Sequence, residues 1–338
     1  MVDARTADPG TGLIQAYLFD GAGGAVRTDA AGVERWKPGG GALWVHMDLS
    51  VKASGAWLAS AAELDPWVVE GLTDPGSRPR AVAFGRGALV VLRGPDLNPG
   101  ANPAKMIPLA IWADGDRLIT LRQHAMRSIT AMRESLEAGA GPETIAAALR
   151  FLLEQLEERS SLVAGGLSSN LESLAECEDP GAAEIERLAG LRHDIARMRR
   201  VLVPQRDAAR SLAEKSAGGV DGVSALSGWI GRDQAAWLSE SASGYAGLAD
   251  ELEALREEAM LIHEEWAQRA AQRTESRLYL LAVLTAVFLP LTLITGMLGM
   301  NVGGVPWAAW RGGFWAVTIA LVLAAAVGLV AAKWKHWL

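Results

Sequence analysis

The chain has 338 residues, 50% of them hydrophobic and 21% charged, and its formal net charge at pH 7 is −7. Nucleic-acid-binding proteins present basic patches to phosphate, so this balance argues against a nucleic-acid partner, whereas it is compatible with attracting cations. The single cysteine, Cys177, excludes an intramolecular disulfide and fits a reducing compartment.

Short apolar runs predict a β-sheet in the first third of the chain. Runs rich in Val, Ile, Leu and aromatic residues are typical of strands, and they lie at residues 13–19, 43–49, 81–84, 89–92, 107–112 and 118–121. Asp114-Gly115 predicts a hairpin between the last two runs, and Gly85-Arg86-Gly87 is a weaker signal for an earlier one. Residues 57–69 predict two short helices around Pro66.

From His124 onward the pattern becomes helical. Residues 143–176 and 182–216 are rich in Ala, Leu, Glu and Arg, and Asp179-Pro180-Gly181 separates them. A helical hairpin that packs on a sheet predicts an α/β/α sandwich with a mixed or antiparallel sheet. We assign this cytoplasmic domain to residues 1–235, and we expect the Gly- and Ser-rich segment 218–232 to end it.

A single long helix is predicted after this domain, from about Ser239 to Met300. Few residues in this segment oppose a helix: Gly244, Gly247 and Pro290. At 1.5 Å per residue such a helix would be about 90 Å long. Residues 236–277 would form its stalk, and the helix would then enter a membrane.

Two long stretches without charged residues predict two transmembrane helices. They cover residues 278–310 and 312–332, and a bilayer core requires roughly 20 apolar residues per helix. We therefore expect a pore-lining span at 278–301, an outer loop at 302–313, and a second span with a cytoplasmic tail at 314–338. A hairpin buried in a soluble core is the alternative explanation.

Basic residues around the spans predict their orientation. They gather at the ends that would share one side of the membrane: Arg269, Arg273 and Arg277 before the first span, and Lys333 and Lys335 after the second. Only Arg311 lies between the spans. By the positive-inside rule, both termini are cytoplasmic and the short loop is outside.

One face of the long helix carries an apolar seam. Its residues alternate spacings of four and three, as in a coiled coil: Leu248, Leu252, Leu255, Ala259, Ile262 and Trp266. The sequence leaves open whether this seam packs on the chain's own helices or on neighbouring subunits.

Residues seven apart on the opposite face form a second column. It is acidic at first, then apolar, then hydroxyl-bearing: Asp250, Glu257, Glu264, Ala271, Leu278, Thr285, Thr292 and Gly299. Such a column stays on one side only if the helix supercoils or is considered locally. The functional hypothesis is an acidic funnel that leads into a pore. The alternatives are solvated surface carboxylates and threonines that bond to their own helix.

The pore hypothesis assigns specific residues. The inner acidic funnel would consist of Asp250, Glu257 and Glu264. Two hydroxyl rings and several apolar constrictions would line the membrane part: Leu278, Leu281, Thr285, Leu289, Thr292 and Gly296.

The first span ends in a motif that resembles a known family. Gly299-Met300-Asn301 lies between two C-terminal spans, and a Gly-Met-Asn tripeptide in this place is the signature of the CorA superfamily of metal-ion transporters. The chain resembles that superfamily over its whole architecture. Within it, residues 300–306 and 199–207 resemble the zinc-transporting ZntB branch, although the second stretch is shared with the wider family.

The resemblance implies a homopentameric funnel in the inner membrane of a bacterium, without a tightly bound cofactor. Gly299, Met300 and Asn301 would form the outer ion mouth, where five Asn301 amide oxygens would contact a hydrated divalent cation without removing its water. Asn301 followed by Gly303 also suits a helix C-cap. The outer loop departs from many relatives, because it contains Arg311 and no carboxylate.

The predicted cargo is Zn²⁺, and resemblance to the ZntB branch implies inward, proton-coupled transport. The residues themselves give neither direction nor coupling. The first alternative is a CorA-like Mg²⁺ or Co²⁺ channel gated by cytoplasmic metal, because oxygen ligands suit hard ions better than zinc. The second is a membrane-anchored coiled-coil scaffold or sensor that conducts nothing. No nucleophile elbow, phosphate loop or catalytic triad is found in the sequence, so we predict no enzymatic activity.

Overall fold

The computed structural model describes residues 7–74, 76–217, 226, 228–300 and 310–334. The chain divides into two compact units, Met1–Ile262 and His263–Leu338. The boundary lies within one helix, α7 (Arg232–Leu298).

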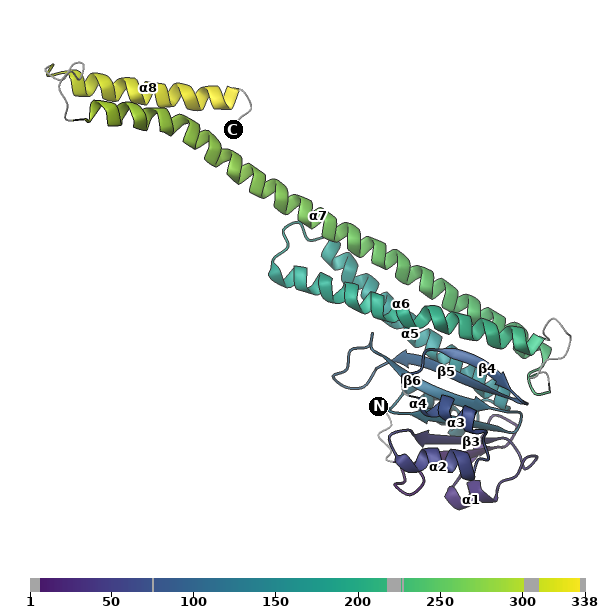
Figure 1. The fold of residues 1–338 in the computed structure, drawn as a ribbon. Helices are drawn as coiled ribbons and strands as arrows, with labels where there is room; N and C mark the ends of the chain where they lie inside the picture. The colour runs from purple at the N-terminus through teal and green to yellow at the C-terminus, as the bar shows by residue number, and fades with distance from the viewer. Residues whose placement is uncertain (1–6, 75, 218–225, 227, 301–309, 335–338) are drawn as a thin grey trace. The chain divides into compact units, whose positions relative to one another are not determined.

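A seven-stranded sheet forms the centre of the first unit (Figure 1). Its strands are β1 (Leu13–Phe19), β2 (Ala25–Thr28), β3 (Leu43–Asp48), β4 (Arg80–Phe84), β5 (Gly87–Pro95), β6 (Met106–Ala113) and β7 (Arg117–Arg122). They are arranged in the order β2-β1-β3-β7-β6-β5-β4. The pair β3 and β7 is parallel and the other neighbours are antiparallel. The sheet is therefore mixed, and both predicted hairpins are confirmed.

Helices cover both faces of this sheet. The short helices α1 (Ala30–Arg35), α2 (Lys52–Ser60) and α3 (Pro66–Thr73) contribute Val33, Leu58 and Val68 to a core cluster with alternate strand residues such as Val45 and Val91. On the other face lie α4 (Arg127–Glu137), α5 (Ile145–Ala175) and α6 (Ala182–Ala217). There Tyr17 of β1 donates a hydrogen bond to Glu137 of α4 at 2.5 Å. The predicted α/β/α sandwich is confirmed.

Two elements of this unit were not predicted. β2 is a four-residue strand at the edge of the sheet, and its side chains are exposed or half-buried. A strand in this position needs no apolar run, and its sequence contains none. α1 buries only Val33, and its start is fixed by the Asp29 carboxylate, which accepts a hydrogen bond from the Gly32 N–H at 2.8 Å. An N-cap of this kind stabilises a short helix that has little apolar periodicity.

The long helix predicted after the sandwich is confirmed as α7, which has 67 residues. It begins at Arg232, directly after Gly231, rather than near Ser239. Gly244 and Gly247 do not interrupt it, because a glycine inside a helix costs only about 1 kcal/mol.

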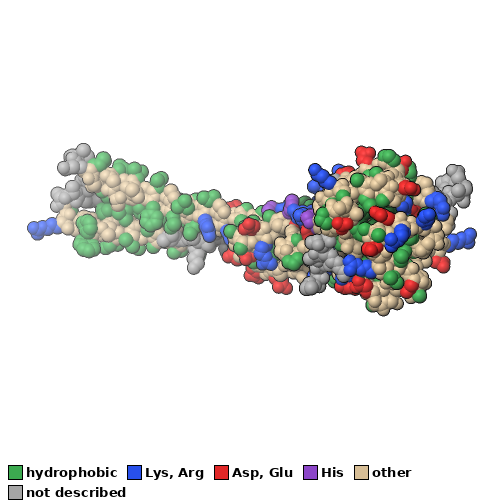
Figure 2. Space-filling model, turned by 90° about the horizontal axis from the view of Figure 1, so that it is seen from below, with side chains coloured by type: hydrophobic (Ala, Val, Ile, Leu, Met, Phe, Trp, Pro, Cys, Tyr) green, Lys and Arg blue, Asp and Glu red, His purple; other side chains and the backbone are tan. Residues whose placement is uncertain are grey.

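The second unit contains the end of α7 and the helix α8 (Gly313–Trp334). The two pack where Gly328 meets Val287: a β-carbon on Gly328 would lie 3.3 Å from a methyl group of Val287. Hydrophobic side chains are spread over the visible surface of this unit, interspersed with backbone and other side chains (Figure 2). α7 contains a stretch long and apolar enough to cross a membrane, and α8 contributes a shorter one, Gly313–Gly328.

Candidate ion pathway

The apolar seam on α7 is buried within the single chain. None of its six residues is more than 5% exposed: Leu248, Leu252, Leu255, Ala259, Ile262 and Trp266. In the first unit α7 is joined to α5 and α6 by polar contacts. Tyr245 donates a hydrogen bond to the Leu153 carbonyl at 3.0 Å, and Arg199 Nε lies 2.6 Å from Glu253. Within this unit, the seam thus packs on the chain's own helices.

The second column on α7 has the opposite character. All its residues are exposed: Asp250, Glu257, Glu264, Ala271, Leu278, Thr285, Thr292 and Gly299. Leu278, at the start of the apolar stretch, is 62% exposed. A face that lines an aqueous path in an assembly must be uncovered in the single subunit, and this face meets that requirement.

The acidic residues of the column form no ion pair with the nearest arginines, although Arg256 feels the charge of its neighbour Glu257. Arg256 lies 2.7 Å from Glu253 and Arg269 lies 2.5 Å from Glu265, so both guanidinium groups are engaged by carboxylates outside the column. Across the described part of the chain, no ion pair involves the column carboxylates Asp250, Glu257 and Glu264. Without an ion-pair partner, these exposed carboxylates can attract cations.

The two threonines of the column bond to their own helix. Thr285 Oγ1 donates to the Leu281 carbonyl and Thr292 Oγ1 donates to the Phe288 carbonyl, each at 2.8 Å. The back-bonding alternative is thus correct for the hydroxyl hydrogens. Each hydroxyl oxygen keeps acceptor capacity, which is what the water shell of a hydrated cation requires, because that water donates hydrogen bonds.

The remaining residues of the predicted pore lining are also exposed: Leu281, Leu289 and Gly296. At the outer mouth, Gly299 and Met300 follow directly after the last residue of α7, and Met300 is 51% exposed. Asn301 and most of the outer loop lie outside the described residues. The role assigned to Asn301 therefore stays a prediction from the sequence.

A preformed metal centre is not found among the residues that the structure describes, because no three His, Cys, Asp or Glu side chains are grouped there. His46 is fully buried in the sheet, where its ring nitrogen lies 2.8 Å from the Thr120 hydroxyl. Burial lowers the pKa of His46 well below its usual value. This histidine is therefore a neutral core residue and not a candidate ligand for a cation.

The stretch 199–207 joins three elements of the first unit. The fully buried Gln205 on α6 accepts a hydrogen bond from the backbone N–H of Arg93 on β5 at 2.8 Å. Arg199, six residues earlier on α6, makes the ion pair with Glu253 of α7. In this chain the stretch therefore connects the sheet to the long helix.

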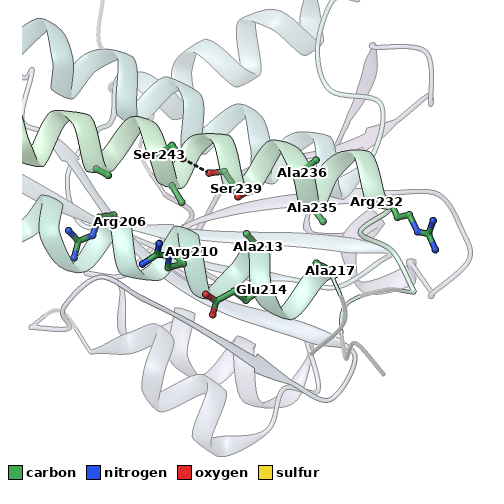
Figure 3. Close-up of a pocket in the computed structure, with 12 residues that line it drawn as sticks. Arg206, Arg210, Ala213, Glu214, Ala217, Arg232, Ala235, Ala236, Ser239 and Ser243 are labelled. Carbon is green, nitrogen blue, oxygen red and sulfur yellow. Dashed lines mark hydrogen bonds between the residues drawn. The ribbon is translucent and has the colours of Figure 1, made fainter. Parts of the chain in front are cut away.

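A groove of about 660 Å³ lies between α6 and the start of α7 in the first unit. Its lining is mostly Ala and Ser, with four charged side chains: Arg206, Arg210, Glu214 and Arg232. Figure 3 shows Arg206 and Arg210 on α6, with Arg232 at the far end. None of the predicted site residues lines the groove. Alanine and serine are common on any helix, so the sequence contains no motif that would have predicted it.

Comparison with known proteins identifies the family. Residues 39–335 match the profile described as CorA-like Mg²⁺ transporter protein. The chain belongs to this CorA-like family. A relative in Pseudomonas aeruginosa, described as divalent cation transporter CmaX, is 34% identical over 310 residues that cover 90% of each protein. The structure of full-length CmaX has a TM-score of 0.80 at 31% identity, covering 96% of this chain and 98% of that one.

More distant CorA-like structures share the fold. The CorA magnesium transporter from Methanocaldococcus jannaschii has a TM-score of 0.80 at 16% identity, covering 96% of this chain and 98% of that one. The ZntB cytoplasmic domain from Vibrio parahaemolyticus has a TM-score of 0.66 at 19% identity, covering 78% and 99%. The predicted superfamily is confirmed, and the absence of enzymatic activity agrees with a family of transporters. Assignment to the ZntB branch stays a prediction.

Proposed function

We propose that the chain is a subunit of a membrane transporter for divalent cations. The observation that carries this proposal is the exposed column on α7. Its carboxylates lack ion-pair partners among the described residues, and the same helix continues through Leu278 to Thr285 and Thr292 in a stretch apolar enough to cross a membrane. Membership in the CorA-like family supports the same function.

The assembly we propose is a homopentamer in a bacterial inner membrane, with both termini in the cytoplasm. A single helix cannot enclose a pore, so several copies of α7 must surround one axis. The exposed column supports this arrangement, because each of its positions becomes a ring of side chains when the subunits repeat. The distribution of basic residues around the two apolar stretches supports the orientation.

For the cargo we propose Zn²⁺, moved inward and coupled to protons, because residues 300–306 resemble the ZntB branch. A second candidate is Mg²⁺ or Co²⁺. It is favoured by the family description and by the candidate ligands, which are oxygens of Asn301, threonines and carboxylates rather than His or Cys. Oxygen donors that bind a hydrated ion suit hard cations.

Flux into liposomes that contain the purified full-length chain tests the function. We expect a divalent-cation-sensitive dye inside the vesicles to respond after addition of Zn²⁺ or Mg²⁺, and empty vesicles to give no signal. Absence of flux for every divalent ion, from a protein that is folded and assembled, would favour the scaffold alternative. Zn²⁺ flux that excess Mg²⁺ barely reduces supports the zinc proposal, whereas strong mutual competition favours Mg²⁺ or Co²⁺.

A further inference from the structure

Three arginines form a row on α7 directly before its apolar stretch. Arg269, Arg273 and Arg277, here called the basic row, are spaced four residues apart, so they lie on one side of the helix. Together with Gln272 and Ser276 they line a hollow of about 480 Å³ in the second unit. Arg273 and Arg277 are exposed.

The basic row lies away from the column that we assign to the pore. At 3.6 residues per turn, Arg269 and Arg273 are roughly 180° and 140° around the helix from Leu278, and Arg277 is about 100° away. Val287, which contacts Gly328 of α8, is also about 180° from Leu278. The basic row therefore continues the side of α7 that packs on α8, beyond the apolar stretch.

The level of the row along α7 matches the headgroup layer of a bilayer. The Cα atoms of Arg277 and Arg273 lie about 1.5 Å and about 8 Å before Leu278 along the axis. The polar layer on each side of the hydrocarbon core is roughly 5–8 Å thick. Arg269 lies deeper in the cytoplasm, at about 14 Å, and it already pairs with Glu265 at 2.5 Å.

We propose that Arg273 and Arg277 bind the phosphate of an anionic phospholipid, with the Gln272 amide as a further donor. Guanidinium groups bind phosphate oxygens through paired N–H bonds, and an anionic headgroup complements a row of positive charge at its own depth. The proposal rests on the proposed function, because that function places Leu278 at the edge of the membrane. A bound lipid would hold the cytoplasmic end of the pore helix without entering the ion path.

Lipid retention by the full-length protein tests this site. The protein in neutral detergent is offered equal amounts of phosphatidylglycerol and phosphatidylcholine, and the bound lipids are counted by native mass spectrometry. We expect wild type to prefer phosphatidylglycerol, and the preference to fall about fivefold for each arginine removed, or roughly 25-fold in Arg273→Gln/Arg277→Gln. The matched control, Arg311→Gln, removes a charge from the other end of the apolar region and should keep the wild-type preference.

Two further arms make the outcome specific. Inorganic phosphate at millimolar concentration should not displace the lipid, and if it does, the site binds free phosphate instead. Arg273→Lys/Arg277→Lys keeps both positive charges and should retain most of the preference for phosphatidylglycerol. This variant keeps the proposal testable if the glutamine variant does not fold. A preference that is absent in wild type, or unchanged in the glutamine variant, overturns the proposal. Because this test measures bound lipid and not flux, its failure can be told apart from a failure of the proposed transport.

Discussion

Tyr245 on α7 donates a hydrogen bond to the backbone carbonyl of Leu153 on α5, and the two oxygens are 3.0 Å apart. The tyrosine side chain is fully buried, and burial raises the pKa of Tyr245 far above its usual value. The hydroxyl is therefore a neutral donor at any physiological pH. This bond fixes the first turns of α7 to the helical layer of the sandwich.

Tyr245→Phe should lower stability by about 1 kcal/mol, because it removes this bond while keeping the ring. For a unit of this size that corresponds to a melting temperature about 3 °C lower. Thermal unfolding of the full-length protein in detergent measures the change. Tyr279→Phe, at a partly exposed tyrosine of α7, is the matched control; an equal shift in both variants would mean that the bond to Leu153 contributes nothing.

Glu157 predicts a pH dependence of stability. Burial raises the pKa of this carboxyl, and Glu154 and Glu240 add to the effect. The folded state therefore binds the proton more tightly than the unfolded chain, so the stabilising contribution of this proton is present at low pH and is lost as pH rises through the folded pKa. Glu157→Gln should raise the melting temperature at pH 7.5, and the gain should vanish below the ordinary value of about 4.5. Glu186→Gln, at an exposed carboxyl of α6, should show no such pattern.

Thr285 and Thr292 should react with a water-borne thiol reagent when each is replaced by cysteine in a Cys177→Ser background. They lie one heptad apart on the exposed column, so the reagent should reach both through the pore, about 10 Å apart along the axis. Val287→Cys should stay protected, because Val287 packs on Gly328 of α8. Protection of 285 and 292 together with labelling of 287 would show that the pore face is assigned wrongly.

The acidic column should raise the flux of cations. Glu257→Gln/Glu264→Gln removes two rings of charge that have no ion-pair partner among the described residues, so flux at low ionic strength should fall up to about tenfold. Raising monovalent salt should shrink the difference from wild type, because salt screens the rings. Glu186→Gln, which removes one exposed carboxylate of α6, serves as the control for lost charge outside the column. Equal transport by both variants at every salt concentration would contradict an acidic funnel.

Asn301→Ala should reduce flux at least about tenfold, because the proposed ring of amide oxygens would lose its contacts to the hydrated ion. The oligomer should be unchanged on size exclusion, since the substitution only removes a small polar group. Asn170→Ala, on the exposed surface of α5, provides the comparison. Wild-type flux in an intact Asn301→Ala oligomer would remove this residue from the ion path.

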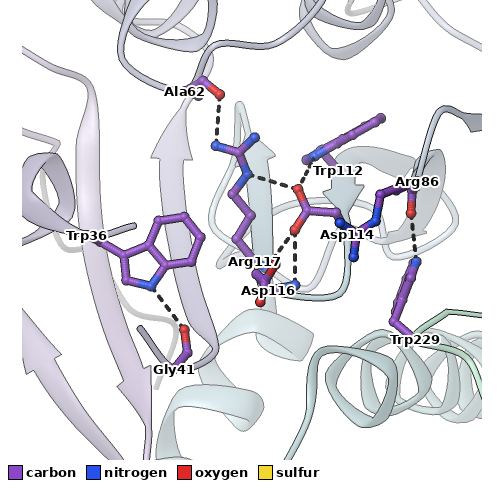
Figure 4. Close-up of polar contacts among 9 residues, drawn as sticks. All are labelled: Trp36, Gly41, Ala62, Arg86, Trp112, Asp114, Asp116, Arg117 and Trp229. Carbon is purple, nitrogen blue, oxygen red and sulfur yellow. Dashed lines mark hydrogen bonds and ion pairs between the residues drawn. The ribbon is translucent and has the colours of Figure 1, made fainter. Parts of the chain in front are cut away.

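The sheet could be predicted where local chemistry is strong. β1 has the bounds of its apolar run, and Asp114 fixes the β6–β7 hairpin in the way its turn sequence indicates (Figure 4). The Asp114 carboxylate accepts hydrogen bonds from the backbone N–H groups of Asp116 and Arg117 at 3.1 and 2.9 Å. By contrast, the exposed edge strand β2 contains no pattern that distinguishes it from a loop.

Long-range partners could not be predicted in the same way. Gly244 was noted only as a residue that opposes a helix, yet the Glu157 carboxylate lies against its backbone, where a β-carbon would collide. On the candidate pathway, the heptad spacing groups residues that are all exposed on α7, and their assignment to a pore stays a prediction. Which carboxylate each arginine engages depends on rotamers and on distances of a few ångströms, so the pairing of Arg256 with Glu253 was beyond sequence reasoning.

The parallel pairing of β3 with β7 has a consequence for synthesis. The register joins Leu43 to Arg117, so the middle of the sheet cannot close until β4, β5 and β6 have been made. The apolar part of α7 begins only at Leu278, and at 5–20 residues per second the ribosome needs roughly 3–12 s to travel there from Ala217, where α6 completes the sandwich. The sandwich therefore has time to fold in water before the first hydrophobic helix is available for membrane insertion. A substitution that slows closure of the sheet would bring an unfinished domain to the membrane and would lower the yield of assembled protein, even if the ion path itself were intact.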